Sequence, residues 1–83
     1  MPYFFYLARC SDDSLYAGIC KDLKEREKKH NDGSGAKYTR SRLPIRFVHT
    51  ETYATKSDAM KREAEVKTWK KEEKEGLIEE KGT

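Results

Sequence analysis

Two short apolar runs joined by turn-forming residues constrain the fold of this chain more than any other feature. Residues 3–10 (YFFYLARC) and 15–20 (LYAGIC) combine aromatic and aliphatic side chains, which favour β-strands. Residues 11–14 (SDDS) between them are all turn formers, although an Asp-Gly pair would be the favoured hairpin turn. The pattern therefore predicts an antiparallel β-hairpin at the start of the chain.

The register of this hairpin decides where its tyrosines point. A four-residue turn places Tyr6 opposite Ile19, three residues from Tyr16. Tyr6 and Tyr16 then face opposite sides of the sheet, because side chains alternate along a strand. A β-bulge or a strand end near Gly18 would be needed to bring both hydroxyls to one site.

The rest of the chain predicts helices and one further strand. We expect a helix from the N-cap Asp22 to about His30, then a polar loop over residues 31–44 and a strand over residues 45–49. A second helix is expected over residues 56–71, after the N-cap Thr55. The chain should end in a last helical stretch, from which Leu77 and Ile78 pack onto the core, and a frayed end at residues 82–83. Trp69 is expected to pack against the sheet. The predicted fold is α+β, with a small three-stranded sheet flanked by helices in the order β-β-α-β-α(-α).

Length and composition bound the possible functions. The 83 residues predict a single domain, and 40% of them are charged, with both signs interspersed. A net charge of +3 permits nucleic-acid binding without requiring it. No apolar run is long enough to cross a bilayer and no basic segment precedes the first one, so we expect a cytoplasmic location. Cys10 and Cys20 lie far apart along the predicted hairpin, which favours reduced thiols over a disulfide.

An ordered set of residues spread along the chain resembles the GIY-YIG nuclease superfamily. The set consists of Tyr6, the stretch 16–19 (YAGI), Arg26 eight residues after Gly18, His30-Asn31, the stretch 37–44 (KYTRSRLP) and the stretch 61–63 (KRE). Phe4-Phe5 stand where the family has Gly-Ile, so only Tyr6 remains of the first triplet. The resemblance covers nearly the whole chain and is closest to small standalone bacterial members, which implies one GIY-YIG domain over residues 1–83.

The resemblance implies a role for each matching residue. Tyr6 would deprotonate or hold the attacking water, and Tyr16 would orient that water or hydrogen-bond a phosphate oxygen. Arg26 would stabilise charge on the phosphate, and His30 would join the catalytic group. Glu63 would be the only protein ligand of a metal ion, while Gly18 and Asn31 would support the site. Arg26 suits its role because a guanidinium stays protonated and meets phosphate with two hydrogen bonds.

The chemistry of phosphodiester hydrolysis agrees with these roles. A tyrosine with its ordinary pKa of about 10 is a poor base at neutral pH unless nearby cations lower that pKa. We expect Arg26 and a divalent metal ion to lower the pKa of Tyr6. A lone carboxylate at Glu63 would hold Mg²⁺, or Mn²⁺ in its place, only weakly without DNA, because water and substrate oxygens must complete the coordination.

Each candidate residue also has an ordinary structural interpretation. The tyrosines would be packing residues, Arg26 a solvated helix residue, and His30 a cation that complements the dipole at a helix C-terminus. Glu63 shares one helix face with Ala59 and Val66, so a carboxylate there needs a partner. That partner could be Arg26, in an ion pair without catalytic meaning.

Residues 33–42 form a second candidate region. Gly33 and Gly35 are expected to make it flexible, while its basic and aromatic side chains suit phosphate contact and base stacking. The nucleic-acid-binding candidates are Lys37, Tyr38, Arg40 and Arg42. An ordinary polar surface loop is the alternative interpretation.

Three functions compete. The first is a metal-dependent DNA endonuclease or nicking enzyme that recognises DNA structure, such as branches or damage, serves repair or recombination, and could rely on a protein partner for targeting. The second is a non-catalytic nucleic-acid-binding module or accessory protein that uses residues 33–42. The third is a protein-interaction domain with a decayed site.

Overall fold

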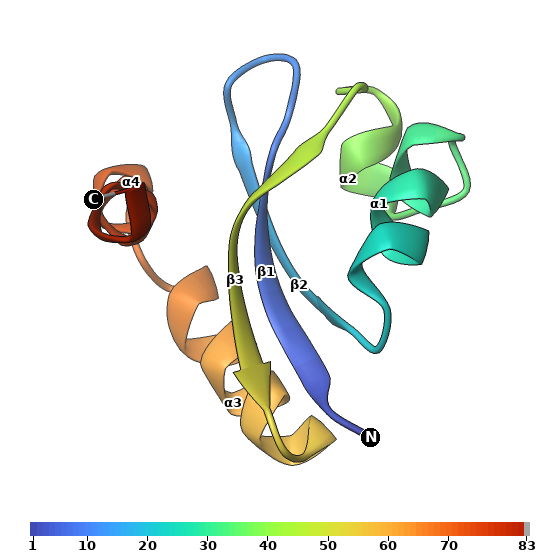
Figure 1. Cartoon of the computed structure of the whole chain (residues 1–83). Coiled ribbons are helices and arrows are strands. Elements are labelled where there is room, and N and C mark those ends of the chain that lie inside the picture. The colour runs from blue at the N-terminus through green and yellow to red at the C-terminus, as the bar shows by residue number, and fades with distance from the viewer. Residues whose placement is uncertain (83) are drawn as a thin grey trace.

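The computed structural model describes residues 1–82, with side chains described for residues 1–78. Over residues 1–82 the chain forms three strands and four helices, in the order β1 (Tyr3–Arg9), β2 (Leu15–Cys20), α1 (Leu23–Asn31), α2 (Lys37–Arg40), β3 (Arg46–Tyr53), α3 (Lys56–Lys67) and α4 (Lys71–Gly82). The strands form one antiparallel sheet with β1 between β2 and β3. Helices α1 and α2 cover one face, and α3 and α4 cover the other (Figure 1). The predicted α+β class is confirmed.

Local rules place the starts of the two long helices correctly. Asp22 caps α1 by accepting a hydrogen bond from the Glu25 N–H at 3.0 Å. Thr55 caps α3 by accepting one from the Asp58 N–H at 3.2 Å. Both side chains satisfy a backbone donor that has no partner inside the helix.

Other boundaries differ from the sequence prediction. The loop predicted over residues 31–44 contains the short helix α2, and β3 runs to Tyr53 instead of ending at residue 49. The helix predicted over residues 56–71 ends at Lys67, because the chain turns at Trp69 so that its ring packs into the core. Gly82 is the last residue of α4, and the fraying predicted for Thr83 lies outside the described residues.

The register of the hairpin differs from the prediction by one residue. Tyr6 lies opposite Gly18, and Ala8 lies opposite Tyr16. The turn is tighter than four residues, because the Cys10 N–H donates to the Ser14 carbonyl and Asp13 adopts a left-handed conformation with φ 70°. Tyr6 and Tyr16 therefore share one face without any bulge between β1 and β2, and the irregularity near this point lies instead between β1 and β3.

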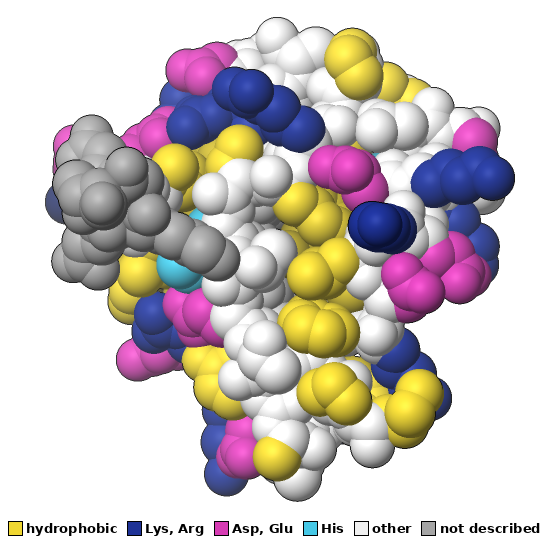
Figure 2. All heavy atoms as spheres, viewed as in Figure 1, with side chains coloured by type: hydrophobic (Ala, Val, Ile, Leu, Met, Phe, Trp, Pro, Cys, Tyr) yellow, Lys and Arg dark blue, Asp and Glu magenta, His cyan; other side chains and the backbone are white. Residues whose placement is uncertain are grey.

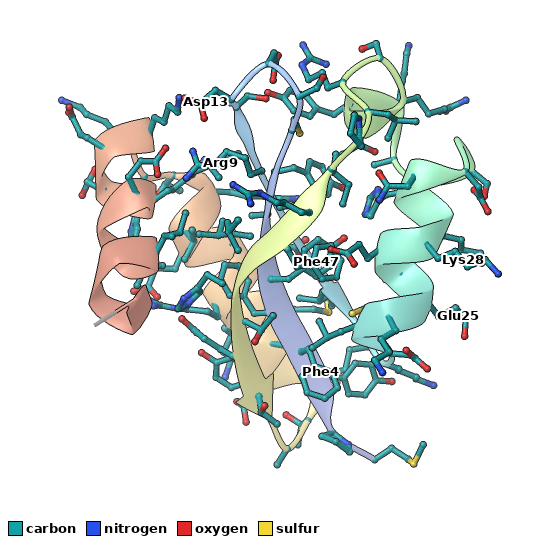
Figure 3. The ribbon with its side chains drawn as sticks, turned by 45° about the horizontal axis from the view of Figure 1, so that its top comes forward. Phe4, Arg9, Asp13, Glu25, Lys28 and Phe47 are labelled. Carbon is teal, nitrogen blue, oxygen red and sulfur yellow. The ribbon has the colours of Figure 1, made fainter. Side chains whose placement is uncertain are left out.

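Side-chain alternation along β1 builds two apolar cores. Tyr6 and Ala8 point toward α1 and pack with Cys10, Cys20 and Ile45. Phe4 and Phe47 also point from the sheet toward α1 (Figure 3). The other face of the sheet packs against α3 and α4 through Phe5, Leu7, Ala17, Val66, Trp69, Leu77 and Ile78, as predicted for the last three.

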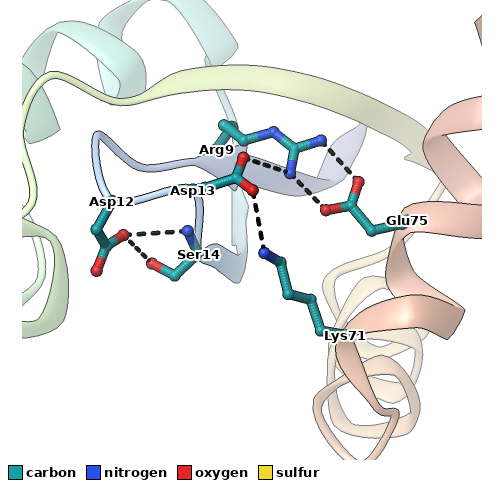
Figure 4. A network of polar contacts seen from close by, with 6 residues as sticks. All are labelled: Arg9, Asp12, Asp13, Ser14, Lys71 and Glu75. Carbon is teal, nitrogen blue, oxygen red and sulfur yellow. Dashed lines mark hydrogen bonds and ion pairs between the residues drawn. The ribbon is translucent and has the colours of Figure 1, made fainter.

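The tip of the hairpin is tied to α4 by charged side chains (Figure 4). Arg9 donates two hydrogen bonds to the Glu75 carboxylate at 2.5 and 2.7 Å, and it also contacts Asp13 at 3.2 Å. Lys71 pairs with Asp13 at 3.2 Å. The contacts with Lys71 and Glu75 join distant parts of the sequence and hold α4 against the turn.

The remaining features concern the surface and the thiols. Acidic and basic side chains are interspersed over the face drawn in Figure 2, and hydrophobic side chains gather along its middle, between the positions of β3 and α1. Cys10 and Cys20 are buried free thiols, as the hairpin geometry predicts. No helix over residues 1–82 combines the length and apolarity needed to span a membrane.

Candidate active site

Tyr6 lies at the centre of the predicted site. Its side chain is 1% exposed and stacks on Phe47, with ring centroids 4.2 Å apart. Its phenol end crosses the backbone of Gly18 on the neighbouring strand so closely that a methyl group at that position would come within 2.6 Å of the Tyr6 Cζ atom. Only glycine at position 18 leaves room for the phenol group of Tyr6.

A chain of hydrogen bonds leads from the Tyr6 hydroxyl into the protein. The Tyr6 hydroxyl lies 2.9 Å from His30 Nε2, and His30 Nδ1 lies 2.9 Å from the Thr39 hydroxyl. The Thr39 hydroxyl donates its proton to the Ala36 carbonyl at 2.9 Å, so it must accept from His30 Nδ1–H. In neutral His30 the Nε2 atom is then an acceptor, and Tyr6 donates to it.

His30 is held neutral by its surroundings. It is 1% exposed, and burial lowers its pKa, with a further contribution from the positive charge of Arg26. The interpretation of His30 as a cation that complements the helix dipole at the end of α1 does not fit this burial and lowered pKa. Gly35 packs against it so closely that a methyl group there would lie 2.8 Å from the His30 Cα atom, which means that Gly35 provides close packing where flexibility was expected.

The acidity of Tyr6 departs from the sequence expectation. Burial raises its pKa well above the ordinary value, and Tyr16 raises it further. Arg26 lowers it, as expected, and Glu63 raises it, so both charges lie near enough to act on the phenol. Burial outweighs Arg26, and Tyr6 is protonated at neutral pH.

Tyr16 belongs to the same aromatic group. Its ring lies edge-on to His30 with centroids 5.6 Å apart, and 6.5 Å from the ring of Tyr6. On its outer side it stacks on Tyr38 of α2 at 5.8 Å, and Arg42 in turn lies 3.9 Å from the Tyr38 ring. Tyr38, predicted as a base-stacking residue, is 40% exposed and adjoins the tyrosine site.

Arg26 and Glu63 approach the site from different helices. Arg26 is exposed on α1, whereas Glu63 lies on α3 between the fully buried positions Ala59 and Val66. The Glu63 carboxylate is 23% exposed and pairs with Lys67 at 3.3 Å. Among the described side chains its ion-pair partner is therefore Lys67, and the structural pair with Arg26 considered from the sequence is not formed.

The donor set at Glu63 is compatible with a hard divalent cation of low affinity. Within residues 1–78 no group of three His, Cys, Asp or Glu side chains gathers that could enclose a metal ion. One accessible carboxylate that keeps several waters and adds substrate phosphate oxygens is a common binding mode for Mg²⁺. The residues therefore fit Mg²⁺ held between Glu63 and a bound substrate.

The basic residues of the second candidate region differ in their availability. Lys37 and Arg40 are exposed on α2. Arg42 donates to the Asp12 carboxylate at 3.0 Å and to the Tyr38 carbonyl at 2.7 Å, so its guanidinium is already engaged although the side chain is 32% exposed. Asn31, predicted as a supporting residue, exchanges two hydrogen bonds with the backbone of Ile45 at 2.7 and 3.0 Å and so fastens α1 to the start of β3.

The sequence prediction missed Thr39. It lies inside the stretch of residues 37–44 that carries the family resemblance, but the sequence pattern alone did not set it apart from the other hydroxyls of the predicted loop. Its inward position follows from the short helix α2, which the sequence did not predict.

Comparison with known proteins agrees with this geometry. Residues 2–76 match the GIY-YIG catalytic domain. The chain belongs to the GIY-YIG family. GIY-YIG domains are nuclease domains that act on DNA and generally use divalent metals.

Relatives and solved structures support the assignment over the full fold. A UPF0213 protein of Staphylococcus epidermidis is 50% identical over 94% of this chain and 95% of its own length, and one of Staphylococcus aureus is 51% identical with the same coverage. The solution NMR structure of the UPF0213 protein BH0048 from Bacillus halodurans is 44% identical, with a TM-score of 0.64 over 99% of this chain and 87% of that one. The protein EF2693 from E. faecalis is 37% identical, with a TM-score of 0.65 over 95% and 84%.

Proposed function

We propose that this protein is a divalent-metal-dependent endonuclease that hydrolyses phosphodiester bonds in DNA. One observation carries the proposal: the hydroxyl of Tyr6 donates to a buried, neutral histidine whose other nitrogen is bound by Thr39. Any buried tyrosine hydroxyl needs a hydrogen-bond partner, but a backbone carbonyl would serve a tyrosine that only packs. A neutral imidazole differs from a carbonyl because it can take up the phenol proton, which a tyrosine that receives a proton from water requires.

The hydrogen-bond chain supplies a base at neutral pH although Tyr6 is protonated. As the water oxygen forms its bond to phosphorus, the water proton moves to the Tyr6 oxygen while the Tyr6 proton moves to His30 Nε2. The bond from phosphorus to the leaving oxygen breaks, and that oxygen takes a proton from solvent. Thr39 keeps the His30 Nδ1 proton in place throughout, so the accepting nitrogen is always the one that faces Tyr6.

The other site residues act on the phosphate. Arg26 would contact its oxygens and offset the charge that develops during the attack. Tyr16, on the same face as Tyr6, would orient the water or hydrogen-bond a phosphate oxygen. Glu63 would hold the divalent ion, Mg²⁺ or Mn²⁺, which when bound neutralises charge on the phosphate and on the leaving oxygen.

The size of the protein favours recognition of DNA structure over sequence. The described residues span only 30 × 29 × 24 Å, so little surface is available for contacts with bases. Specific recognition of a sequence needs several side chains that reach base edges. We therefore propose branched or damaged DNA as the substrate, in repair or recombination, with a protein partner as a second means of targeting.

Cleavage of labelled DNA in Mg²⁺ and Mn²⁺ tests the proposal. The panel contains duplex, single-stranded, flap and branched DNA, and the variants are Glu63→Ala and Glu72→Ala, the latter an exposed carboxylate on α4 that serves as the charge-matched control. We expect metal-dependent cutting that is lost only in Glu63→Ala. Cutting by Glu63→Ala at the wild-type rate would refute the metal assignment. Salt-sensitive binding without any cutting by the wild type would favour the non-catalytic binding module.

A further inference from the structure

A cleft lies at the edge of the sheet beside the candidate active site. It has a volume of about 440 Å³ and opens between the end of β2, the first turns of α1 and the first residue of α3. Tyr3 and Ile19, both partly buried, contribute its apolar lining. Arg26 lines the cleft and also acts on the pKa of Tyr6, so the cleft and the tyrosine site adjoin each other.

The rim of the cleft is basic. Lys21, Arg26, Lys29 and Lys56 come from three separate parts of the fold and all are exposed. Within residues 1–78 none of these four forms an ion pair, whereas several other cations of the chain are paired with carboxylates. Lys21 instead lies 5.6 Å from the centre of the Tyr3 ring. Cations gathered in this way around one hollow are disposed to meet an extended polyanion.

Two carboxylates also line the cleft, but they offset the cations only in part. Asp22 accepts a hydrogen bond from the Glu25 N–H at 3.0 Å, so it is engaged at the positive end of α1. Glu25 lies in the first turn of the same helix, where its charge is likewise compensated by the helix dipole. The formal charge of the lining is four positive against two negative, so the cleft keeps an excess of positive charge.

We propose that this cleft binds the backbone of a single DNA strand next to the phosphate that is cut. The inference rests on the proposed function, because it places the scissile phosphate at Arg26 and the neighbouring phosphates on the three lysines. Basic grooves with an aromatic side chain in the lining are the usual means of holding single-stranded nucleic acid, since lysines track the phosphates and a ring contacts a base. The surface that binds the strand is then this cleft and not residues 37–42.

Binding of a short fluorescent single-stranded DNA in EDTA tests the cleft without any cutting. The cleft variant combines Lys21→Gln, Lys29→Gln and Lys56→Gln. The matched control combines Lys24→Gln, Lys28→Gln and Lys61→Gln, which removes the same charge from exposed lysines outside the cleft. Lys28 points away from the sheet (Figure 3). A third variant, Lys37→Gln with Arg40→Gln, tests the rival surface.

The dependence of the dissociation constant on salt is the quantity to compare. Removing one phosphate-binding cation from a single-strand site lowers the slope of log K against log salt by about 0.7, so the slope of the cleft variant should fall by roughly two. The control variant should keep the wild-type slope. An unchanged slope in the cleft variant, an equal fall in the control, or a fall confined to the Lys37 and Arg40 variant overturns the inference.

The outcome is separable from that of the proposed function. If the slope of the cleft variant falls as expected while the wild type cuts no DNA under any condition, the binding inference stands and the endonuclease proposal fails. If the wild type cuts DNA and the cleft variant keeps its slope, the endonuclease proposal stands and the cleft inference fails.

Discussion

Replacing Thr39 by valine tests the hydrogen-bond chain at its least exposed link. Thr39 is 0% exposed, and valine has nearly the same volume, so the change removes a hydroxyl without opening a cavity. Two hydrogen bonds disappear, the one from His30 Nδ1–H and the one to the Ala36 carbonyl, each 2.9 Å long. The imidazole of His30 then loses the hydrogen bond that favours the tautomer protonated on Nδ1.

The expected cost in stability follows from the unpaired groups. A buried donor left without an acceptor costs about 1–3 kcal/mol. For a chain of this length each kcal/mol lowers the melting temperature by roughly 4–8 °C, so a loss of about 2 kcal/mol corresponds to roughly 8–16 °C. Thr39→Ser is the matched control, because it keeps the hydroxyl and loses only a methyl group.

Imidazole ¹⁵N NMR and cleavage kinetics distinguish a role of Thr39 in proton transfer from a role in packing alone. Wild type and Thr39→Ser should show His30 protonated on Nδ1, while Thr39→Val should lose that preference. Cleavage by Thr39→Val should fall at least tenfold, because proton transfer by a positioned side chain contributes about 10²–10⁴-fold and the variant keeps only part of it. Wild-type His30 protonated on Nε2, or a Thr39→Val protein that cuts and melts like the wild type, would refute the reasoning.

Three further outcomes can be measured with the wild type and single-residue variants. Gly18→Ala should lower the urea midpoint by an amount worth about 1–3 kcal/mol, because its methyl group meets the Tyr6 ring, whereas Gly76→Ala, in open space on α4, should be neutral or stabilising; equal midpoints would contradict the packing argument. Burial raises the pKa of Glu51, but hydrogen bonds from Arg62, His49 and Tyr53 outweigh it and lower that pKa to about 2. The stability from Glu51 is therefore complete above about pH 4.5 and is lost as the pH falls toward 2, up to about 3 kcal/mol, and acid titration of Glu51→Gln should show a smaller loss. Because the pKa of His30 is lowered, the acid limb of the cleavage rate should lie below the ordinary histidine value of about 6.5, and a limb above it would count against His30 as the proton acceptor.

Local rules predicted the elements of this fold well and their exact pairing poorly. The caps at Asp22 and Thr55 depend on side chains within three residues of the helix start, so the sequence contains all that is needed. The hairpin register depends on the left-handed conformation of Asp13. This conformation could not be predicted, because the turn contains no glycine to indicate it. A one-residue error there reversed the predicted facing of Tyr6 and Tyr16.

The sequence could predict the site features that depend on residue type and spacing. It could not predict those that depend on how the chain packs. Arg26, His30 and Glu63 were proposed from the ordered set that resembles the GIY-YIG superfamily, and the structure brings all three near Tyr6. The importance of Gly35 could not be inferred in this way, because it depends on how closely the chain after α1 returns to His30. The raised pKa of Tyr6 was missed for the same reason, since burial is a property of the assembled core and not of the neighbouring charges alone.

The tight turn between β1 and β2 has a consequence for how relatives should be compared. An insertion or deletion between Cys10 and Ser14 that shifts the pairing of β2 by one residue would turn its side chains to the opposite face and carry Tyr16 away from Tyr6. Such a change would separate the two tyrosines without a substitution at either of them. In an alignment of relatives, a gap at this turn therefore predicts a separated tyrosine pair more strongly than a substitution at most surface positions does.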